Sequence, residues 1–310
     1  MSWLLLALVA AAIAAPYLAE RGRPRMGDHL RQQAPGQFVT LSRGVTHYQW
    51  RGPDDAPVAV CVHGLTTPSF VWGPIAEGLV AMGFRVLTYD LYGRGYSDRP
   101  RGDQDAAFFV AQLEELLENQ QVDGEFTLMG YSMGGAISAA YAAKHPGRLH
   151  QLVLLAPAGL GHDLGPIARL VANRKWLGGW LMMAWYGRSY AQALEAERDL
   201  RSAIPGIVDR QKSELGYRGF RGAVLASMRG ILDTEQEADH RQIAAAGTPV
   251  LAIWGRDDEV IPIAGKQKLT GWNPDAVNGV VEDAGHALAY THPGEVIALL
   301  RKTLILPGNA

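Results

Sequence analysis

Ser132 is the residue in this chain best placed to do chemistry, because glycines stand on either side of it. Residues 130–134 read Gly-Tyr-Ser-Met-Gly, the single Gly-x-Ser-x-Gly run in the sequence. The segment Glu125–Gly130 predicts a strand, and the spacing over Met133–Lys144 predicts a helix. So sharp a turn from strand to helix needs glycine beside the serine, holds the serine in a strained backbone conformation and exposes its hydroxyl. The pattern predicts a nucleophilic serine.

From about Gln37 to its end, the chain resembles the α/β-hydrolase family, in the branch that carries a helical cap. The resemblance rests on the glycine-flanked serine and on three further runs: His-Gly-Leu at 63–65, Gly-Arg-Asp-Asp at 255–258 and Ala-Gly-His at 284–286. It implies an α/β-hydrolase fold, a mostly parallel central sheet flanked by helices with an inserted helical cap. It also implies a serine hydrolase similar to esterases and monoacylglycerol lipases.

A serine hydroxyl needs a nearby base whose pKa is close to neutral, which histidine supplies. The chain has nine histidines. In the family, the acid and then the histidine follow the nucleophile along the chain. His286 comes after the last predicted strand, residues 279–282, and the resemblance implies that it is the general base for Ser132.

The acid that orients this histidine is expected after the penultimate predicted strand, Pro249–Trp254. Residues 255–262 match the family's Gly-x-x-Asp-x-x-x-Pro run, which selects Asp258. Its carboxylate would accept a hydrogen bond from His286, fix the tautomer and stabilise the imidazolium. Asp257 stays open as the alternative, because a register error of one residue would exchange the two carboxylates.

The resemblance further implies that the backbone N–H groups of Leu65 and Met133 form the oxyanion hole. Such donors must be in place before the reaction, and losing one typically costs about 10²–10³ in rate. His63 is interpreted as a structural histidine that braces the same turn. Asp90 lies where some proteins of this fold use a carboxylate, but the Gly-Arg-Gly run that follows it favours a structural turn.

Other chemistries lack their motifs. The dinucleotide-binding run Gly-x-Gly-x-x-Gly would need a third glycine where the chain has Asp98. The sequence has no His-Glu-x-x-His and no spaced Cys and His ligands, so neither a metal nor a cofactor is expected. Ser132 in place of an aspartate argues against epoxide hydrolase and haloalkane dehalogenase chemistry, which needs a carboxylate nucleophile.

Alternatives to an esterase stay open. A carbon–carbon bond hydrolase uses the same three residues, although such enzymes often carry Asn at the position of Tyr131. A perhydrolase or an acyltransferase would look the same at these residues. A non-catalytic binding protein of this fold belongs to another class and should lack one of Ser132, Asp258 and His286, yet the sequence has all three.

The composition describes a globular chain of 310 residues, 48% hydrophobic and 19% charged. A formal net charge of −2 gives no electrostatic reason to expect nucleic acid as a partner. The family resemblance implies a small-molecule ester substrate instead. The single cysteine, Cys61, excludes an internal disulfide and lies in an apolar run, which favours a buried structural thiol.

The N-terminal segment is the outlier in composition. Residues 2–19 carry no charge and, as a helix, span about 27 Å, close to the roughly 30 Å hydrocarbon core of a bilayer. Residues 1–20 are therefore expected to be a single-pass membrane anchor. Arg21, Arg23 and Arg25 follow, which predicts a cytoplasmic catalytic domain. The alternatives are a signal peptide cleaved from a secreted or periplasmic protein, and a soluble or interfacial helix.

The rest of the chain divides by its pattern. Residues 21–36 are rich in Arg, Gly and Pro and predict a tether. Strand and helix patterns alternate over 37–160, the expected first part of the α/β core. Residues 161–246 show helical patterns without strands and are expected to form the cap or lid. The alternation returns over 247–310, the expected second part of the core.

Aromatic residues and methionines gather in the expected cap. Trp176, Trp180 and Met183 are therefore expected to line an acyl-chain pocket, since pockets for apolar ligands are lined in this way. The alternative is that these side chains only pack the cap onto the core. Together with a membrane anchor, an apolar pocket favours a lipid-derived ester such as a monoacylglycerol or a lysophospholipid.

Overall fold

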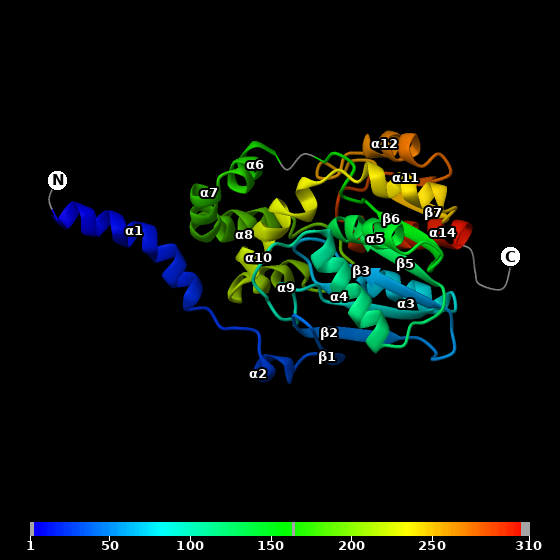
Figure 1. Ribbon diagram of the computed structural model, residues 1–310, viewed down its shortest axis with the longest axis horizontal. Helices are drawn as coiled ribbons and strands as arrows, with labels where there is room; N and C mark the ends of the chain where they lie inside the picture. Colours follow the sequence, from blue (N-terminus) through cyan, green and yellow to red (C-terminus); the bar gives the residue numbers. More distant parts are fainter. Residues whose placement is uncertain (1–2, 163–164, 305–310) are drawn as a thin grey trace.

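The computed structural model describes residues 3–162 and 165–304, and these contain one eight-stranded sheet of order β1-β2-β4-β3-β5-β6-β7-β8 (Figure 1). The strands are β1 (Gln37–Leu41), β2 (Gly44–Arg51), β3 (Val58–Val62), β4 (Arg85–Tyr89), β5 (Phe126–Tyr131), β6 (Leu149–Leu155), β7 (Val250–Gly255) and β8 (Val277–Val281). β1 pairs antiparallel with β2, and β2 with β4, whereas every other neighbouring pair is parallel. The predicted mostly parallel sheet is confirmed.

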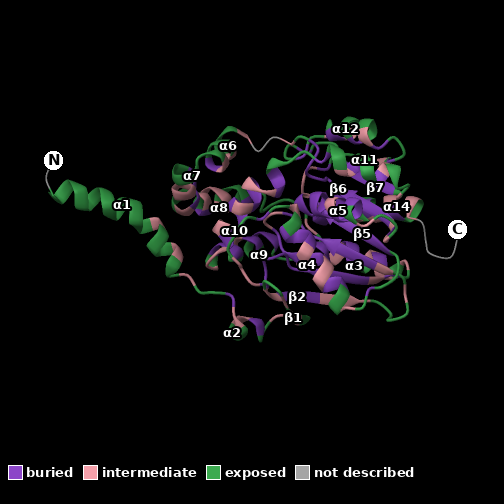
Figure 2. Cartoon of the chain, viewed as in Figure 1, coloured by how far each residue is buried: buried purple, intermediate pink, exposed green. Residues whose placement is uncertain are grey.

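Helices cover both faces of the sheet, which is why its central strands are apolar throughout. All six residues of β5 and of β7 are buried, as Figure 2 shows for the centre of the molecule. α3 (Gly73–Ala81) and α14 (Pro293–Thr303) contact each other, and α4 (Ala106–Asn119), α5 (Met133–Lys144), α11 (Glu237–Ala245) and α12 (Gly265–Trp272) form another contiguous layer. Burying each Leu, Ile or Val side chain of such a core contributes about 1.5–3 kcal/mol.

The chain between β6 and β7 forms helices in its described part. They are α6 (Gly165–Asn173), α7 (Lys175–Leu181), the π-helical turn η2 (Met182–Tyr186), α8 (Gly187–Ala196), α9 (Ile207–Ser213), α10 (Phe220–Arg229) and α11, with short turns η3 (Glu214–Gly216) and η4 (Ile231–Asp233). α11 packs against α5 and α12, in the layer that covers the sheet. The range 161–246 expected for the cap therefore includes one helix of that layer, and the cap boundaries otherwise stay a prediction.

A buried arginine ties the cap to the core. Arg94 has no exposed surface and follows β4. Its guanidinium donates hydrogen bonds of 2.8 Å to the carbonyl oxygen of Leu65, to Gln104 and to Ser227 Oγ on α10. One cation thus holds a loop at the end of β3 and a cap helix in a fixed relation.

The N-terminal helix α1 (Trp3–Arg21) projects away from the body of the molecule (Figure 1). None of its residues is buried, and it alone in the described chain is long and apolar enough to cross a membrane, judged by length and composition. It contacts the cap at α7 and η2, and a short helix, α2 (Asp28–Arg31), follows it. Residues 1–2, 163–164 and 305–310 of the predicted ranges lie outside the described chain.

Candidate active site

Ser132 lies at the turn between β5 and α5. Its backbone has φ 55° and ψ −122°, a left-handed region that costs a non-glycine residue about 1–3 kcal/mol. A Cβ at Gly130 would lie 2.3 Å from the carbonyl oxygen of Gly134, and a Cβ at Gly134 would lie 2.1 Å from that of Val62. The turn therefore closes only with glycine at both positions.

Hydrogen bonds from neighbouring segments hold the turn in this conformation. The N–H of Ser132 donates to the carbonyl oxygen of Leu155 at the end of β6, 2.9 Å away. Its own carbonyl oxygen accepts from the N–H groups of Gly135 and Ala158, at 2.8 and 3.0 Å. These bonds offset the local strain and fix the direction of the hydroxyl.

Ser132, His286 and Asp258 form one hydrogen-bonded chain. His286 Nε2 lies 3.0 Å from Ser132 Oγ, and His286 Nδ1 lies 2.8 Å from Asp258 Oδ2. The hydroxyl of Tyr131 donates to the backbone oxygen of His286, and the two rings are stacked with centroids 5.4 Å apart. The imidazole is thus held on two sides, with one nitrogen facing the serine.

The two neighbouring aspartates have different surroundings. The side chain of Asp258 is fully buried, and its Oδ1 accepts hydrogen bonds from the N–H groups of Val260 and Ile261, at 2.9 and 2.8 Å. Asp257 is exposed, and its N–H donates to the carbonyl oxygen of Ala284. Of these two carboxylates, the geometry brings Asp258 to the histidine.

The loop after β3 runs close to the serine. A Cβ at Gly64 would lie 3.2 Å from Ser132 Cβ, so this loop and the start of α5 flank the hydroxyl. Leu65 belongs to this loop, and Met133 is the first residue of α5. A helix start directs free N–H groups and a positive dipole end toward developing negative charge.

His63 supports that loop from inside the core. Its Nδ1 donates to the carbonyl oxygen of Gly64 at 2.8 Å, and its Nε2 accepts from the N–H of Leu91 at 2.9 Å. Burial lowers the pKa of His63 to about 4, so the ring is neutral and can accept this hydrogen bond. These contacts agree with a structural histidine.

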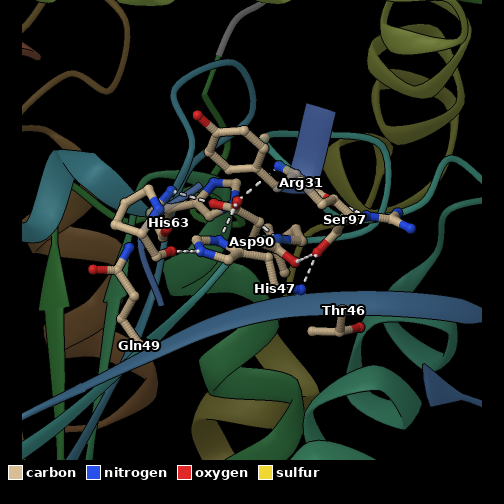
Figure 3. A network of polar contacts seen from close by, with 12 residues as sticks. Arg31, Thr46, His47, Gln49, His63, Asp90 and Ser97 are labelled. Atoms are coloured by element: carbon tan, nitrogen blue, oxygen red, sulfur yellow. Dashed lines mark hydrogen bonds and ion pairs between the residues drawn. The ribbon is translucent and has the colours of Figure 1, made fainter. Parts of the chain in front are cut away.

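Asp90 lies in a buried network beside this loop, not in the chain of Ser132 (Figure 3). Its Oδ2 contacts His47 Nδ1 at 2.8 Å and accepts from the N–H of Tyr96, while Oδ1 accepts from the N–H of Ser69. Ser97 Oγ donates to its backbone oxygen. Every part of the residue is engaged in holding the turn.

A cavity of about 1120 Å³ opens above Ser132 and His286. Its apolar wall includes Leu65, Tyr190, Leu194, Leu200, Leu232 and Ile261. Its polar wall includes Thr66, Thr67, Glu197, Arg201 and Gln211. Burial raises the pKa of Glu197 above its ordinary value. The site thus offers both apolar and polar surface to a ligand.

Trp176, Trp180 and Met183 do not line this cavity. Trp176 on α7 is 85% exposed, and Trp180 Nε1 donates to the carbonyl oxygen of Ala12 on α1, at 3.4 Å. Met183 lines a second cavity beside the end of α1. The physical reason is that α7 and η2 contact α1, and the side chains of Trp180 and Met183 lie on that side.

The cap residues that line the serine cavity come mainly from α8 and the segment after it, together with Gln211 on α9 and Leu232 on η4. Tyr190 and Leu194 stand four residues apart on α8, and Glu197 follows three residues later. This spacing places all three on one face of a helix, a pattern that was visible in the sequence. The sequence-based prediction instead used the aromatic content of α7 and η2, which precede α8.

The comparisons with known proteins agree with this fold. Residues 54–289 match the model of the family described as serine aminopeptidase, S33. The chain belongs to this family of α/β hydrolases. A monoacylglycerol lipase from Mycolicibacterium smegmatis is 30% identical over 228 residues, which cover 70% of this chain and 76% of the lipase.

Solved structures of α/β hydrolases are similar in fold. A carboxylesterase of Nitrososphaera gargenis has a TM-score of 0.71 at 21% identity, covering 86% of this chain and 97% of the other. A membrane phospholipase A, described as a bacterial virulence factor, has a TM-score of 0.71 at 20% identity and covers 96% and 94% of the two chains. The family match and the similarity to a monoacylglycerol lipase together indicate that the chain is a hydrolase.

Proposed function

We propose that the protein is a serine hydrolase that cleaves carboxylic esters through an acyl-enzyme intermediate. The observation that carries the proposal is the chain of hydrogen bonds from Ser132 Oγ through His286 to the buried carboxylate of Asp258. A serine, a histidine and a carboxylate in this order have the geometry of acyl transfer.

In the proposed mechanism, Ser132 Oγ attacks the ester carbonyl while His286 Nε2 takes its proton. Asp258 keeps the other ring nitrogen protonated and stabilises the imidazolium. The backbone N–H groups of Leu65 and Met133 hold the oxyanion. The alcohol leaves with the proton from His286, and water then cleaves the acyl-enzyme by the same route.

The two walls of the cavity support the proposed substrate class. An ester with an apolar acyl chain and a small polar alcohol, such as a monoacylglycerol, matches the apolar side chains around Leu194 and the polar ones around Glu197 and Gln211. The similarity to a monoacylglycerol lipase supports the same class. We therefore propose that the acyl pocket is lined by residues of α8 rather than by Trp176, Trp180 and Met183.

We further propose that α1 anchors the protein in a membrane with the catalytic domain on the cytoplasmic side. The helix is apolar and exposed along its length, and Arg21, Arg23 and Arg25 follow its apolar part. Fractionation of cells that express the tagged chain distinguishes a membrane anchor from a cleaved signal peptide, because an anchored protein stays in the membrane fraction. A soluble protein of reduced mass would show signal cleavage instead.

Ser132→Ala tests the proposed nucleophile. The variant should keep the fold, yet lose labelling by a fluorophosphonate and lose hydrolysis of p-nitrophenyl esters. Ser189→Ala, at a partly buried position of α8 with a local hydrogen bond to the carbonyl oxygen of Tyr186, is the matched control and should keep both. A Ser132→Ala protein that still labels and hydrolyses would refute the mechanism. A preference for acetyl over long acyl esters in the wild-type protein would refute the lipid substrate.

A further inference from the structure

A second cavity, of about 860 Å³, lies where the end of α1, the tether, the loop after β4 and α10 come together. Its charged lining consists of six arginines and two carboxylates: Arg21, Arg25, Arg43, Arg99, Arg101 and Arg218, with Glu20 and Asp98. Tyr17, Met26 and Met183 add apolar surface. The cavity is separate from the one that contains Ser132.

Both carboxylates of this lining are already engaged. Glu20 accepts a hydrogen bond of 2.8 Å from the N–H of Gly219 and pairs with Arg23 at 3.1 Å. Asp98 pairs with Arg31 at 2.6 Å. Neither Arg23 nor Arg31 is one of the six lining arginines, so these contacts leave the positive charge of the cavity uncompensated.

Of the six arginines, Arg99 alone has a carboxylate partner within the described residues, Glu214 at 3.3 Å. The other five form no ion pair in the part of the chain that the structure describes: Arg21, Arg25, Arg43, Arg101 and Arg218. Arg43 instead lies over the ring of Phe108. Guanidinium groups that converge in this way favour an anion with several oxygens, because each can donate two hydrogen bonds to it.

The position of the cavity along α1 indicates the source of such an anion. Arg21 ends α1, whose apolar stretch is about as long as the hydrocarbon core is thick. The arginines after it would then lie at the depth of the lipid headgroups. Basic pockets between helices at this depth bind anionic headgroups. Tyr17 and Met183 supply apolar contacts for the part of a lipid next to its phosphate.

We propose that this cavity binds the phosphate-bearing headgroup of an anionic phospholipid. The inference rests on the proposed membrane association of α1 and is independent of the proposed hydrolysis at Ser132. The bound headgroup would bridge the tether, the loop around Arg101 and the cap at Arg218, in addition to the ion pairs Arg31–Asp98 and Arg99–Glu214 that already join these segments. Lipid binding would therefore stabilise the junction between anchor and cap.

The test uses the full chain in micelles of a neutral detergent, titrated with dioctanoylphosphatidylglycerol, with dioctanoylphosphatidylcholine or with inorganic phosphate. The readout is the unfolding temperature, because a ligand that binds only the folded state raises it. Phosphatidylglycerol should raise it in a saturable way that weakens at high salt, and the other two should not. Equal effects of the two lipids, or an equal effect of phosphate alone, would overturn the proposal.

Arg25→Gln/Arg101→Gln removes two exposed guanidinium groups from the cavity. It should raise the apparent Kd for phosphatidylglycerol about tenfold, equivalent to about 1.4 kcal/mol. Arg301→Gln/Lys302→Gln, on α14 and outside this cavity, is the control of equal charge and should bind like the wild type. Both variants should hydrolyse a soluble ester at the wild-type rate. Unchanged binding in the cavity variant, or an equal loss in the control, would refute the site, whereas the fractionation experiment tests the anchor separately.

Discussion

The described part of the chain contains two His–Asp pairs of nearly the same local geometry, His286 with Asp258 and His47 with Asp90. In each, Nδ1 of the ring lies 2.8 Å from a carboxylate oxygen. They differ at Nε2, which in His286 faces Ser132 Oγ beside a cavity and in His47 faces the carbonyl oxygen of Pro35. A His–Asp contact alone therefore does not mark a reaction centre, because the group that meets Nε2 decides what the pair can do.

Burial separates the two pairs as well. The side chains of His47 and Asp90 are each 2% exposed, whereas that of His286 is 23% exposed. Burial alone would lower the pKa of His47, but the hydrogen bond and charge of Asp90 outweigh it and raise that pKa. Burial is likewise outweighed at Asp90, whose pKa is held well below its usual range by His47, His63 and Ser69. Both shifts favour the charged forms of this inner pair, His47 with Asp90, whose contacts are structural.

The largest expected effect is a loss of activity that distinguishes His286 from His292, another histidine of the same cavity. His286→Ala should lower kcat/KM for p-nitrophenyl butyrate by about 10⁴-fold or more, because it removes the proposed base. The unfolding temperature should change little, since the ring is partly exposed. His292→Ala, in the same cavity, is the control and should stay within about tenfold of wild type. Equal losses in the two variants would contradict the assignment of the base.

The next effect distinguishes the two neighbouring aspartates. Asp258→Asn should lower kcat by about 10⁴-fold, because an amide at this position favours the wrong tautomer of His286. Asp257→Asn should have a far smaller effect, since its side chain is exposed and does not contact the histidine. Steady-state kinetics of both variants on one ester decides the choice. A larger loss for Asp257→Asn would reverse it.

Substitution of His47 in the inner pair should lower the stability of the fold and should not affect catalysis by the folded protein. His47→Ala leaves the buried carboxylate of Asp90 without its partner, and breaking a buried pair in this way costs about 3–5 kcal/mol. Urea unfolding of the variant measures this loss. The fraction of His47→Ala molecules that remains folded should still be labelled by a fluorophosphonate. A stable but unreactive His47→Ala protein would show that the two pairs do not differ as described.

The smallest effect is the pH dependence of that stability. The pKa of His47 is raised above 6.5, so its contribution is complete below pH 6.5 and is lost as the pH rises through the raised pKa. The contribution of Asp90 is present above its ordinary value of 3.8 and is lost as the pH falls through its lowered pKa. The gap in unfolding free energy between wild type and His47→Gln should therefore be larger at about pH 6 than at about pH 9. If the unfolding free energies of the wild type and His47→Gln changed in parallel with pH, a charged His47–Asp90 pair would be contradicted.

The elements that carry the serine could be predicted because their pattern is local. The helix expected over Met133–Lys144 has those bounds in the structure, and the strand expected over Glu125–Gly130 is Phe126–Tyr131. Each of these depends on hydrophobic spacing and on nearby glycines, which a single sequence contains.

The cavity wall could not be predicted in the same way, because it depends on which faces of the cap helices meet the core. Trp176 has the composition expected of a lining residue, yet it is 85% exposed on a helix whose partner is α1. Leu194 and Glu197 line the cavity, but their residue types do not indicate that their face of the helix is the one that meets it. The arginine cavity had no sequence pattern either, since its six arginines come from four separate segments.

The contacts of Arg94 limit how far the cap can be treated as an exchangeable part. Its guanidinium joins the carbonyl oxygen of Leu65 to Ser227 on α10. A cap transplanted from a relative would have to supply an acceptor where Ser227 stands, because a buried cation that loses an acceptor destabilises the fold. Chimeras that keep this acceptor are the ones to build first. A cap with a different sequence is therefore compatible with this core only if it offers a hydrogen-bond acceptor to the buried guanidinium of Arg94.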